Sequence, residues 1–339
     1  MAIVVLGGSN SLYQNGWVSH LSEKTDQEVR NLSVGASSSL AALYRFLGDN
    51  GPTSGDLVVW EYAINDLNHH LISDYSYDLL MHNVEHLIRL CRERGCPLVP
   101  VIMTAREQEV SKSRDPYYER LASLFDAYGL SSFDVSQAYR KSIWPWRRRG
   151  MGRDAYSDAA HYKRDPKIMK FVVQGFLKAM ETATVPAKIE PLYTGDATVR
   201  LLSEFPSGER FTNRVIDVPA DPLPLKVASP VDGALIGVYY ICYPANESGV
   251  VVSSGNADNS ATFSTFRDGN FRRPLMKSLS IVNLRGEGLA VAAEAPISLT
   301  PITEPGKYYC EPEISAVINT PAEDPATKIA GLLFEIPAA

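Results

Sequence analysis

The sequence has few cysteines and no long hydrophobic run. Its 339 residues include only four cysteines, Cys91, Cys96, Cys242 and Cys310, too few for a disulfide scaffold in a chain of this length. Cys91 and Cys96 are spaced C-x4-C rather than the C-x2-C typical of metal ligands. No apolar stretch approaches the roughly 18 residues that would indicate a transmembrane helix. We therefore expect no membrane span.

The sequence also lacks an excess of positive charge and the residue pattern of a signal peptide at its start. The net charge is -6 and the isoelectric point is about 5.6, which argues against nucleic acid as the main partner. The N-terminal segment has no basic residues, and its short apolar run ends at Gly7 and Gly8. This pattern does not fit a signal peptide, so we expect a cytoplasmic protein.

What is present indicates a folded chain of two domains. Hydrophobic residues make up 45% and charged residues 21% of the sequence, which excludes disorder as a global description. Dividing the length by about 150 residues per domain suggests two domains. Sixteen of the 22 prolines follow residue 183, and the whole net charge of -6 lies on that second part. We therefore predict domains at 1–183 and 184–339.

The two parts have different hydrophobic patterns. Residues 1–183 alternate apolar strands with helical periodicity, which predicts a parallel sheet with helices on both faces. The expected strands are 3–6, 28–34, 56–62, 98–103 and 132–135, and the expected helices are 15–23, 38–47, 79–91, 117–128 and 166–178. Residues 184–339 contain short, alternating, β-branched segments, which predict an antiparallel β-sandwich.

Residues suited to acyl transfer follow the predicted strands. Ser9, Gly35 and Asn65 come just after the first three strands, where open parallel sheets bind their ligands. Asp158 and His161 precede the last helix, and all six histidines of the chain lie in the first part. Ser9 would attack, His161 would take its proton, and Asp158 would orient His161. The N–H groups of Ser9 and Gly35 with the Asn65 amide would form the oxyanion hole.

This set of motifs resembles the SGNH hydrolase superfamily, the GDSL-type esterases and acyltransferases. The resemblance covers roughly residues 1–182, with the family serine at Ser9, glycine at Gly35, asparagine at Asn65 and D-x-x-H pair at Asp158 and His161. It implies a flavodoxin-like, three-layer α/β/α fold and no metal or organic cofactor.

The sequence departs from the family pattern at two positions. Gly8 replaces the acidic residue of G-D-S, and Ala63 replaces the glycine of G-x-N-D. The G-x-S-x-G motif of α/β-hydrolases is absent around Ser9, which argues against that fold.

Each motif also has a purely structural interpretation. Ser9 can serve as a turn or cap residue and Gly35 as a turn glycine. Ser11 is the alternative nucleophile, although its offset from the strand fits a cap position better. Taken alone, Asp158 and His161 would fit a pair of surface residues at the start of a helix.

The remaining polar residues near these motifs have less specific patterns. His82 and His86 are spaced i, i+4, but they belong to no H-E-x-x-H motif, and we assign no metal ligand. His69 and His70 shortly follow Asn65 and fit a polar loop or, as the alternative, the border of the pocket. Asp66 follows Asn65, and we predict that it holds the Asn65 segment by hydrogen bonds.

Aromatic residues offer candidate sugar contacts. Trp144, Trp146 and Arg147 shortly precede the D-x-x-H pair and are predicted to stack on a sugar or bind an anionic group. A packed tryptophan beside a solvated basic loop is the alternative. In the second part, Tyr239, Tyr240 and Tyr243 fit a glycan-binding face or, more commonly for strand aromatics, the core.

Together these features predict a serine enzyme that forms an acyl intermediate on Ser9. The preferred substrate is an O-acetylated carbohydrate or another short acyl ester, cleaved by water. The alternatives are an O-acyltransferase that acetylates a glycan from acetyl-CoA, a non-catalytic glycan-binding protein, and a lipase or thioesterase. The sequence leaves the acyl group, the sugar and the oligomeric state open, including a homo-oligomer.

Overall fold

The computed structural model describes residues 1–111, 113–142, 153–244, 248–255, 258–265, 273–311, 316–322 and 326–338. The chain divides into two compact units. The α/β unit comprises residues 1–67 and 80–193, and the β unit comprises residues 68–79 and 194–339.

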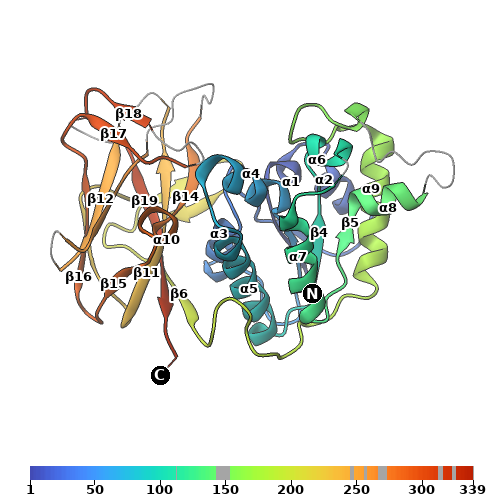
Figure 1. Cartoon of the computed structure of the whole chain (residues 1–339), viewed down its shortest axis with the longest axis horizontal. Coiled ribbons are helices and arrows are strands. Elements are labelled where there is room, and N and C mark those ends of the chain that lie inside the picture. Colours follow the sequence, from blue (N-terminus) through green and yellow to red (C-terminus); the bar gives the residue numbers. More distant parts are fainter. Residues whose placement is uncertain are drawn as a thin grey trace. The chain divides into compact units, whose positions relative to one another are not determined.

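A five-stranded parallel sheet forms the centre of the α/β unit (Figure 1). Its strands are β1 (Ile3–Gly7), β2 (Val29–Asn31), β3 (Leu57–Glu61), β4 (Leu98–Ile102) and β5 (Phe133–Asp134). They lie in the order β2-β1-β3-β4-β5, and every neighbouring pair is parallel. Every residue of β1, β3 and β4 is buried, as expected for strands covered on both faces. The predicted parallel sheet is therefore confirmed.

Helices cover both faces of this sheet (Figure 1). They are α1 (Ser9–Leu12), α2 (Trp17–Ser22), α3 (Leu40–Leu47), α4 (Ala63–Ser73), α5 (Tyr77–Arg94), α6 (Arg106–Val110), α7 (Pro116–Ala127), α8 (Val135–Ser142), the 3-10 helix η1 (Arg153–Ala155) and α9 (Pro166–Met180). One face packs against α2 and α9, which contribute Trp17 and Phe176 to a core with Val5 and Val59. On the other face, Phe125 of α7 packs edge-on against Trp60. This arrangement is the predicted three-layer α/β/α fold.

Sequence signals set the start of two of these helices. Asp115 and Asp165 are the N-cap residues of α7 and α9, and each accepts a hydrogen bond from a backbone N–H of the first turn. A proline follows each of them at the first helical position, where its missing N–H costs nothing.

The prediction of a polar loop at His69 and His70 is wrong, because this segment is helical. Both lie on α4, which begins directly after β3. Ile64 and Leu67 are buried on this helix three residues apart, a spacing that places them on one face. The apolar stripe is too short to stand out among the polar residues of this segment.

The β unit consists of antiparallel sheets packed face to face. One sheet contains β10 (Leu225–Ala228), β16 (Pro296–Pro301), β12 (Gly249–Ser254) and β13 (Ser260–Ser264), in that order. The other has β14 (Leu275–Ser280), β11 (Gly233–Cys242), β19 (Lys328–Ile336) and β6 (Thr198–Leu202), with β15 (Leu289–Val291) and β9 (Asp221–Pro222) at its margins. Val252 and Leu299 of the first sheet share a core with Val238 and Leu332 of the second. The predicted sandwich is therefore confirmed.

Smaller elements complete the β unit. They are the ribbons β7 (Arg210–Thr212) with β8 (Asp217–Pro219) and β17 (Gly306–Tyr308) with β18 (Ala316–Ile318), and the short helix α10 (Ile281–Arg285). Residues 68–79 also belong to this unit. The Asn283 side chain donates to the carbonyl oxygen of Ser73 at 2.8 Å, and Tyr75 Oη donates to Glu311 Oε1 at 2.5 Å. These bonds hold the segment on the β unit.

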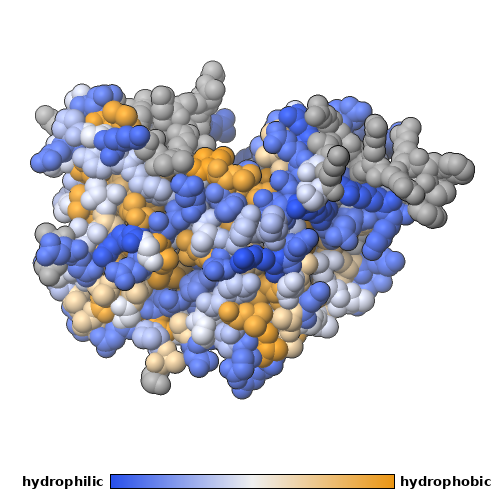
Figure 2. All heavy atoms as spheres, in the orientation of Figure 1, coloured by the Kyte–Doolittle hydropathy of each residue, from blue (hydrophilic) through white to orange (hydrophobic). Residues whose placement is uncertain are grey.

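The face drawn in Figure 2 is mainly hydrophilic among the residues that are coloured. On the face drawn in Figure 2, hydrophobic side chains form small separate patches between polar ones. Leu71, Leu192 and Val317 are among the described large hydrophobic residues that remain more than half exposed. No helix within the described ranges combines the length and the apolar character that a membrane crossing needs.

Candidate active site

Ser9 stands at the carboxyl end of β1, the strand between β2 and β3. The strand ends at Gly7, and α1 begins at Ser9 after the extended residue Gly8. This sharp change from strand to helix directs the Ser9 side chain beyond the edge of the sheet. Its Oγ lies 2.7 Å from Nε2 of His161. The structure therefore places the predicted nucleophile within hydrogen-bond distance of the predicted base.

Asp158 holds the other side of the imidazole. Nδ1 of His161 lies 2.8 Å from Oδ2 and 2.9 Å from Oδ1 of Asp158. Because a carboxylate can only accept hydrogen bonds, Nδ1 carries the proton and Nε2 is free to accept from Ser9. The three predicted residues thus form a continuous Ser–His–Asp chain with the tautomer that a general base needs.

The Asp158 carboxylate also organises its own loop. Oδ1 accepts from the backbone N–H groups of Ala160 and His161, each at 2.9 Å. Partial burial acts to raise the pKa of Asp158, but these hydrogen bonds and the one from the His161 ring hold the pKa below its usual value. The side chain is 53% exposed, so solvent weakens its interaction with His161. Asp158 is therefore an ionised but screened partner.

Gly35 lies directly beside the nucleophile. A methyl group added to Gly35 would lie 3.6 Å from Cβ of Ser9 and 3.3 Å from Cδ1 of Leu12. The next residue, Ala36, has a positive φ of 53°, which turns the chain sharply after Gly35. This geometry brings the backbone of the loop after β2 close to Ser9, as an oxyanion donor requires.

Asn65 lies against the residue that precedes Ser9. It belongs to the first turn of α4, and its side chain is largely buried. A methyl group added to Gly8 would come within 2.0 Å of Asn65 Oδ1. The absence of a side chain at Gly8 therefore makes room for the Asn65 amide, and a larger residue at this position would require that amide to move.

A buried polar network supports the start of α4. Asp66 accepts from Ser39 through the backbone N–H at 2.7 Å and the hydroxyl at 2.6 Å, and from the Tyr117 hydroxyl at 3.1 Å. Trp60 donates to the same Ser39 hydroxyl. Complete burial raises the pKa of Asp66 to about 7, although its hydrogen bonds oppose the shift. The prediction that Asp66 holds the Asn65 segment by hydrogen bonds is confirmed.

Ser11, the alternative nucleophile, is buried within a different network. It is 1% exposed, its hydroxyl donates to Glu61 Oε2 at 2.7 Å, and it accepts from the Trp17 indole N–H at 3.2 Å. Complete burial raises the pKa of Glu61 to about 8. Ser11 is therefore a structural residue on the buried side of α1, and Ser9 is the serine that contacts His161.

The sequence analysis missed three residues around this site. Asn10 and Tyr13 carried no recognisable signal, but Glu61 stood out as a charge in an apolar strand and could have been found. The Tyr13 ring packs edge-on against His161 with a centroid separation of 5.3 Å, and the Arg164 guanidinium lies 5.0 Å from the Tyr13 centroid. Tyr13 therefore covers one edge of the catalytic imidazole.

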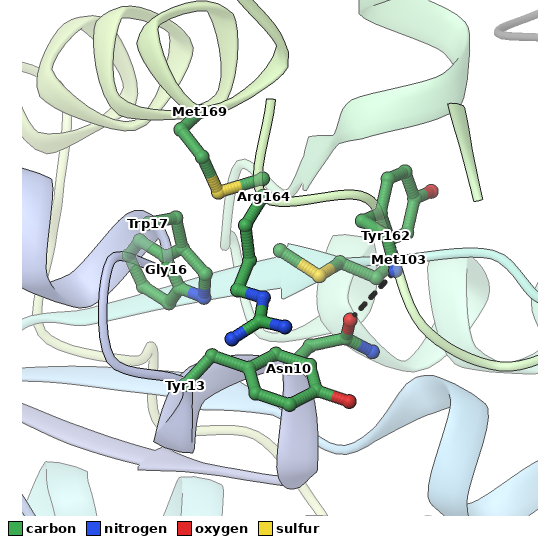
Figure 3. A pocket seen from close by; sticks show the side chains of 8 residues that line it. All are labelled: Asn10, Tyr13, Gly16, Trp17, Met103, Tyr162, Arg164 and Met169. Atoms are coloured by element: carbon green, nitrogen blue, oxygen red, sulfur yellow. Dashed lines mark hydrogen bonds between the residues drawn. The ribbon is translucent and has the colours of Figure 1, made fainter. Parts of the chain in front are cut away.

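A small pocket adjoins the site without containing it (Figure 3). It is lined by Asn10, Tyr13, Gly16, Trp17, Met103, Tyr162, Arg164 and Met169. Its volume of about 10 Å³ is close to the minimum for a single water molecule. None of the predicted catalytic or oxyanion residues lines it. This pocket is therefore not the place for the acyl group or the sugar.

The other predicted binding residues have different outcomes. Trp144, Trp146 and Arg147 lie outside the described residues. Tyr239 and Tyr240 are at most 1% exposed and therefore belong to the core rather than to a glycan-binding face. His82 and His86 lie on α5, and their rings pack edge-on with their centroids 4.5 Å apart.

Comparisons with known proteins bear on the fold. No family model and no curated protein matches the sequence. Two solved structures of a two-domain esterase, described as active on acetylated mannans, match 100% of this chain. The structure co-crystallised with mannopentaose has a TM-score of 0.63 at 13% identity, with 91% of that chain covered. The second has a TM-score of 0.60 at 13% identity, with 92% covered. The chain therefore has the fold of this two-domain esterase, an α/β/α unit joined to a β-sandwich.

Proposed function

We propose that the protein is a serine esterase that removes O-acetyl groups from a carbohydrate. The observation that carries this proposal is the hydrogen-bonded chain from Ser9 Oγ through His161 to Asp158. Gly35 and Asn65 beside it supply the remaining requirement of acyl transfer, which is stabilisation of an oxyanion.

The geometry supports a two-step reaction. Ser9 Oγ attacks the acetyl carbonyl carbon while its proton passes to His161 Nε2. The oxyanion of the tetrahedral intermediate accepts hydrogen bonds from the N–H groups of Ser9 and Gly35 and from the Asn65 amide. His161 then gives the proton to the departing sugar oxygen, which leaves acetyl-Ser9. A water molecule attacks this ester, His161 takes its proton, and acetate leaves as Ser9 regains the proton.

The choice of an acetylated carbohydrate is supported by the likeness over the whole chain. The similar two-domain esterase is described as active on acetylated mannans, and one of its structures was co-crystallised with mannopentaose. We infer a carbohydrate ester of the same general class for this chain, with Trp144, Trp146 and Arg147 as proposed sugar contacts.

Acetate release tests the proposal. Wild type, Ser9→Ala and His161→Ala are compared on p-nitrophenyl acetate, acetylated manno- and xylo-oligosaccharides and a long-chain acyl ester. We expect hydrolysis of the acetylated sugars, with a loss of about 10³-fold or more in both variants and unchanged melting temperatures.

Each rival function predicts a different outcome. Ser9-dependent acetylation of a sugar acceptor from acetyl-CoA, with little hydrolysis, would identify an acyltransferase. Preference for the long-chain ester would identify a lipase or thioesterase. Unchanged acetate release in Ser9→Ala would mean that Ser9 is not the nucleophile, and sugar binding without turnover would identify a glycan-binding protein.

A further inference from the structure

The residue that follows the nucleophile contacts the loop that carries the base. Asn10 is 6% exposed. Its Nδ2 donates to the carbonyl oxygen of Ala160 at 3.0 Å, and its Oδ1 accepts from the backbone N–H of Tyr162 at 3.0 Å. Figure 3 shows the second of these bonds. The Asn10 side chain is therefore hydrogen-bonded to the backbone on both sides of His161.

Two sets of bonds fix the His161 loop. Asp158 accepts from the N–H groups of Ala160 and His161, and Ser157 N–H donates to the His161 carbonyl oxygen at 2.9 Å. These bonds shape the loop internally. The Asn10 bonds differ because they connect the loop to α1, the helix that begins with Ser9.

Only a short primary amide suits this position. The site needs one donor and one acceptor at opposite ends of a planar group, facing a backbone carbonyl and a backbone N–H two residues apart. Aspartate has nearly the same shape but no donor, and a carboxylate oxygen would face the carbonyl oxygen of Ala160. Alanine would leave both backbone groups without their partner.

We propose that Asn10 is a positioning residue that sets the distance between Ser9 Oγ and His161 Nε2. The inference rests on the proposed function, because it matters only if these two atoms exchange a proton. Asn10 and Ser9 are adjacent in the chain and share one rigid helical turn. The amide therefore fixes the backbone of the His161 loop relative to the helical turn that carries Ser9. Proton transfer depends steeply on such alignment, and a misplacement of about 1 Å can cost about 10²-fold in rate.

The test compares Asn10→Ala and Asn10→Asp with wild type and with Asn31→Ala. Asn31 is the matched control, because its Nδ2 donates to the carbonyl oxygen of Ser11 on α1 and its Oδ1 accepts from Ser33 N–H. It thus also forms two side-chain bonds to backbone groups, one of them on the same helix, and neither bond involves the His161 loop. The readouts are kcat and KM for p-nitrophenyl acetate, the rate of Ser9 labelling by a fluorophosphonate, and the melting temperature.

We expect both Asn10 variants to lower kcat and the labelling rate by about 10- to 100-fold, with KM changed by no more than about twofold. Asn31→Ala should leave kcat within about twofold of wild type while lowering the melting temperature to a similar extent. An unchanged kcat in both Asn10 variants would overturn the proposal. Failure of both to fold would assign Asn10 to general stability and would also overturn it.

A double-mutant cycle identifies the residue through which Asn10 acts. In a His161→Ala background, Asn10→Ala should lower the residual rate by no more than about twofold, because no base remains to be positioned. A full further loss in that background would show that Asn10 acts on Ser9 or on the fold as a whole.

The labelling readout also separates this inference from the proposed function. If the wild-type protein reacts with the fluorophosphonate but cleaves no acetylated sugar, the substrate proposal fails. The labelling rates of the Asn10 variants would still decide the role of Asn10.

Discussion

The α/β unit and the β unit both bury carboxyl groups, but these groups support different parts of the molecule. In the α/β unit, Asp66 follows Asn65 directly, and Glu61 accepts from Ser11 on the nucleophile helix. In the β unit, Glu311 accepts from Tyr75 and from Ser280 N–H. Burial raises the pKa of Glu61 to about 8 and those of Asp66 and Glu311 to about 7.

The comparison shows that a shifted pKa does not by itself indicate catalysis. The buried acids are partnered mainly by hydroxyl and backbone donors, and their shifts follow from burial. The acid that contacts His161, the proposed general base, is Asp158, which is half-exposed and has a lowered pKa. The candidate chemistry thus belongs to an ionised residue at the surface, while the buried acids hold segments of chain in place.

Among the variants that compare the two units, the largest effect is expected at Gly8, where the sequence departs from the SGNH motif that it resembles. Gly8→Asp restores the family residue, yet its Cβ would come within 2.0 Å of Asn65 Oδ1. We expect Asn65 to be displaced from the oxyanion hole and kcat for p-nitrophenyl acetate to fall by about 10²- to 10³-fold. Gly8→Ala should behave similarly, because the clash comes from the Cβ atom. Wild-type kcat in either variant would show that Asn65 does not stabilise the oxyanion.

A smaller loss is expected when the exposed acid is neutralised. Asp158→Asn retains an acceptor for the two backbone N–H groups but removes the charge that faces His161. Because the carboxylate is screened by water, we expect kcat to fall by about 10- to 100-fold, less than the roughly 10⁴-fold loss known for a buried triad aspartate. Steady-state kinetics measure the effect. A loss as large as that of His161→Ala would mean that Asp158 is shielded during the reaction.

A matched pair of tyrosines compares the two units directly. Tyr117 donates to Asp66 in the α/β unit, and Tyr75 donates to Glu311 in the β unit. Replacing either by phenylalanine removes a donor from a buried acid and should lower the free energy of unfolding by about 1–3 kcal/mol. Tyr117→Phe should also lower kcat by about three- to tenfold through Asp66 and Asn65. Denaturant titration and kinetics measure the two effects, and a comparable fall in kcat for Tyr75→Phe would break the distinction between the units.

The last expected effect is a pH dependence of stability. The pKa values of Glu61 and Asp66 are raised in the folded chain above their ordinary values of 4.5 and 3.8. The folded state therefore holds more protons than the unfolded state between about pH 4 and pH 8, so the free energy of unfolding falls as pH rises through this range. In Glu61→Gln the melting temperature should fall less between about pH 5 and pH 8 than in wild type.

Glu311→Gln is the corresponding variant of the β unit. It should reduce the pH dependence of the melting temperature by the part that comes from the raised pKa of Glu311. Histidine titrations are common to all three proteins and cancel in the comparison. An equally steep fall in Glu61→Gln and wild type would mean that Glu61 is ionised in the folded protein.

Much of the fold followed from local patterns. The continuous apolar runs around Val4, Val58 and Val99 predicted buried parallel strands, and Asp165 with Pro166 predicted the start of α9. The pattern did not reveal α4, because its apolar stripe is short, or the association of residues 68–79 with the β unit. That association depends on Tyr75 and Glu311, which are more than 200 residues apart in the sequence.

The sequence by itself determined which chemical groups the site contains and the order in which the strands present them, because parallel strands bring their carboxyl ends to one edge. Only the tertiary structure decided which serine contacts His161, since Ser9 and Ser11 are two residues apart and differ in what surrounds them. The structure also shows that Asn65 occupies the space where a side chain at position 8 would lie. It shows that Asn10 is hydrogen-bonded to the loop of His161. These outcomes depend on contacts between segments up to 152 residues apart, and no local pattern of residues encodes such contacts.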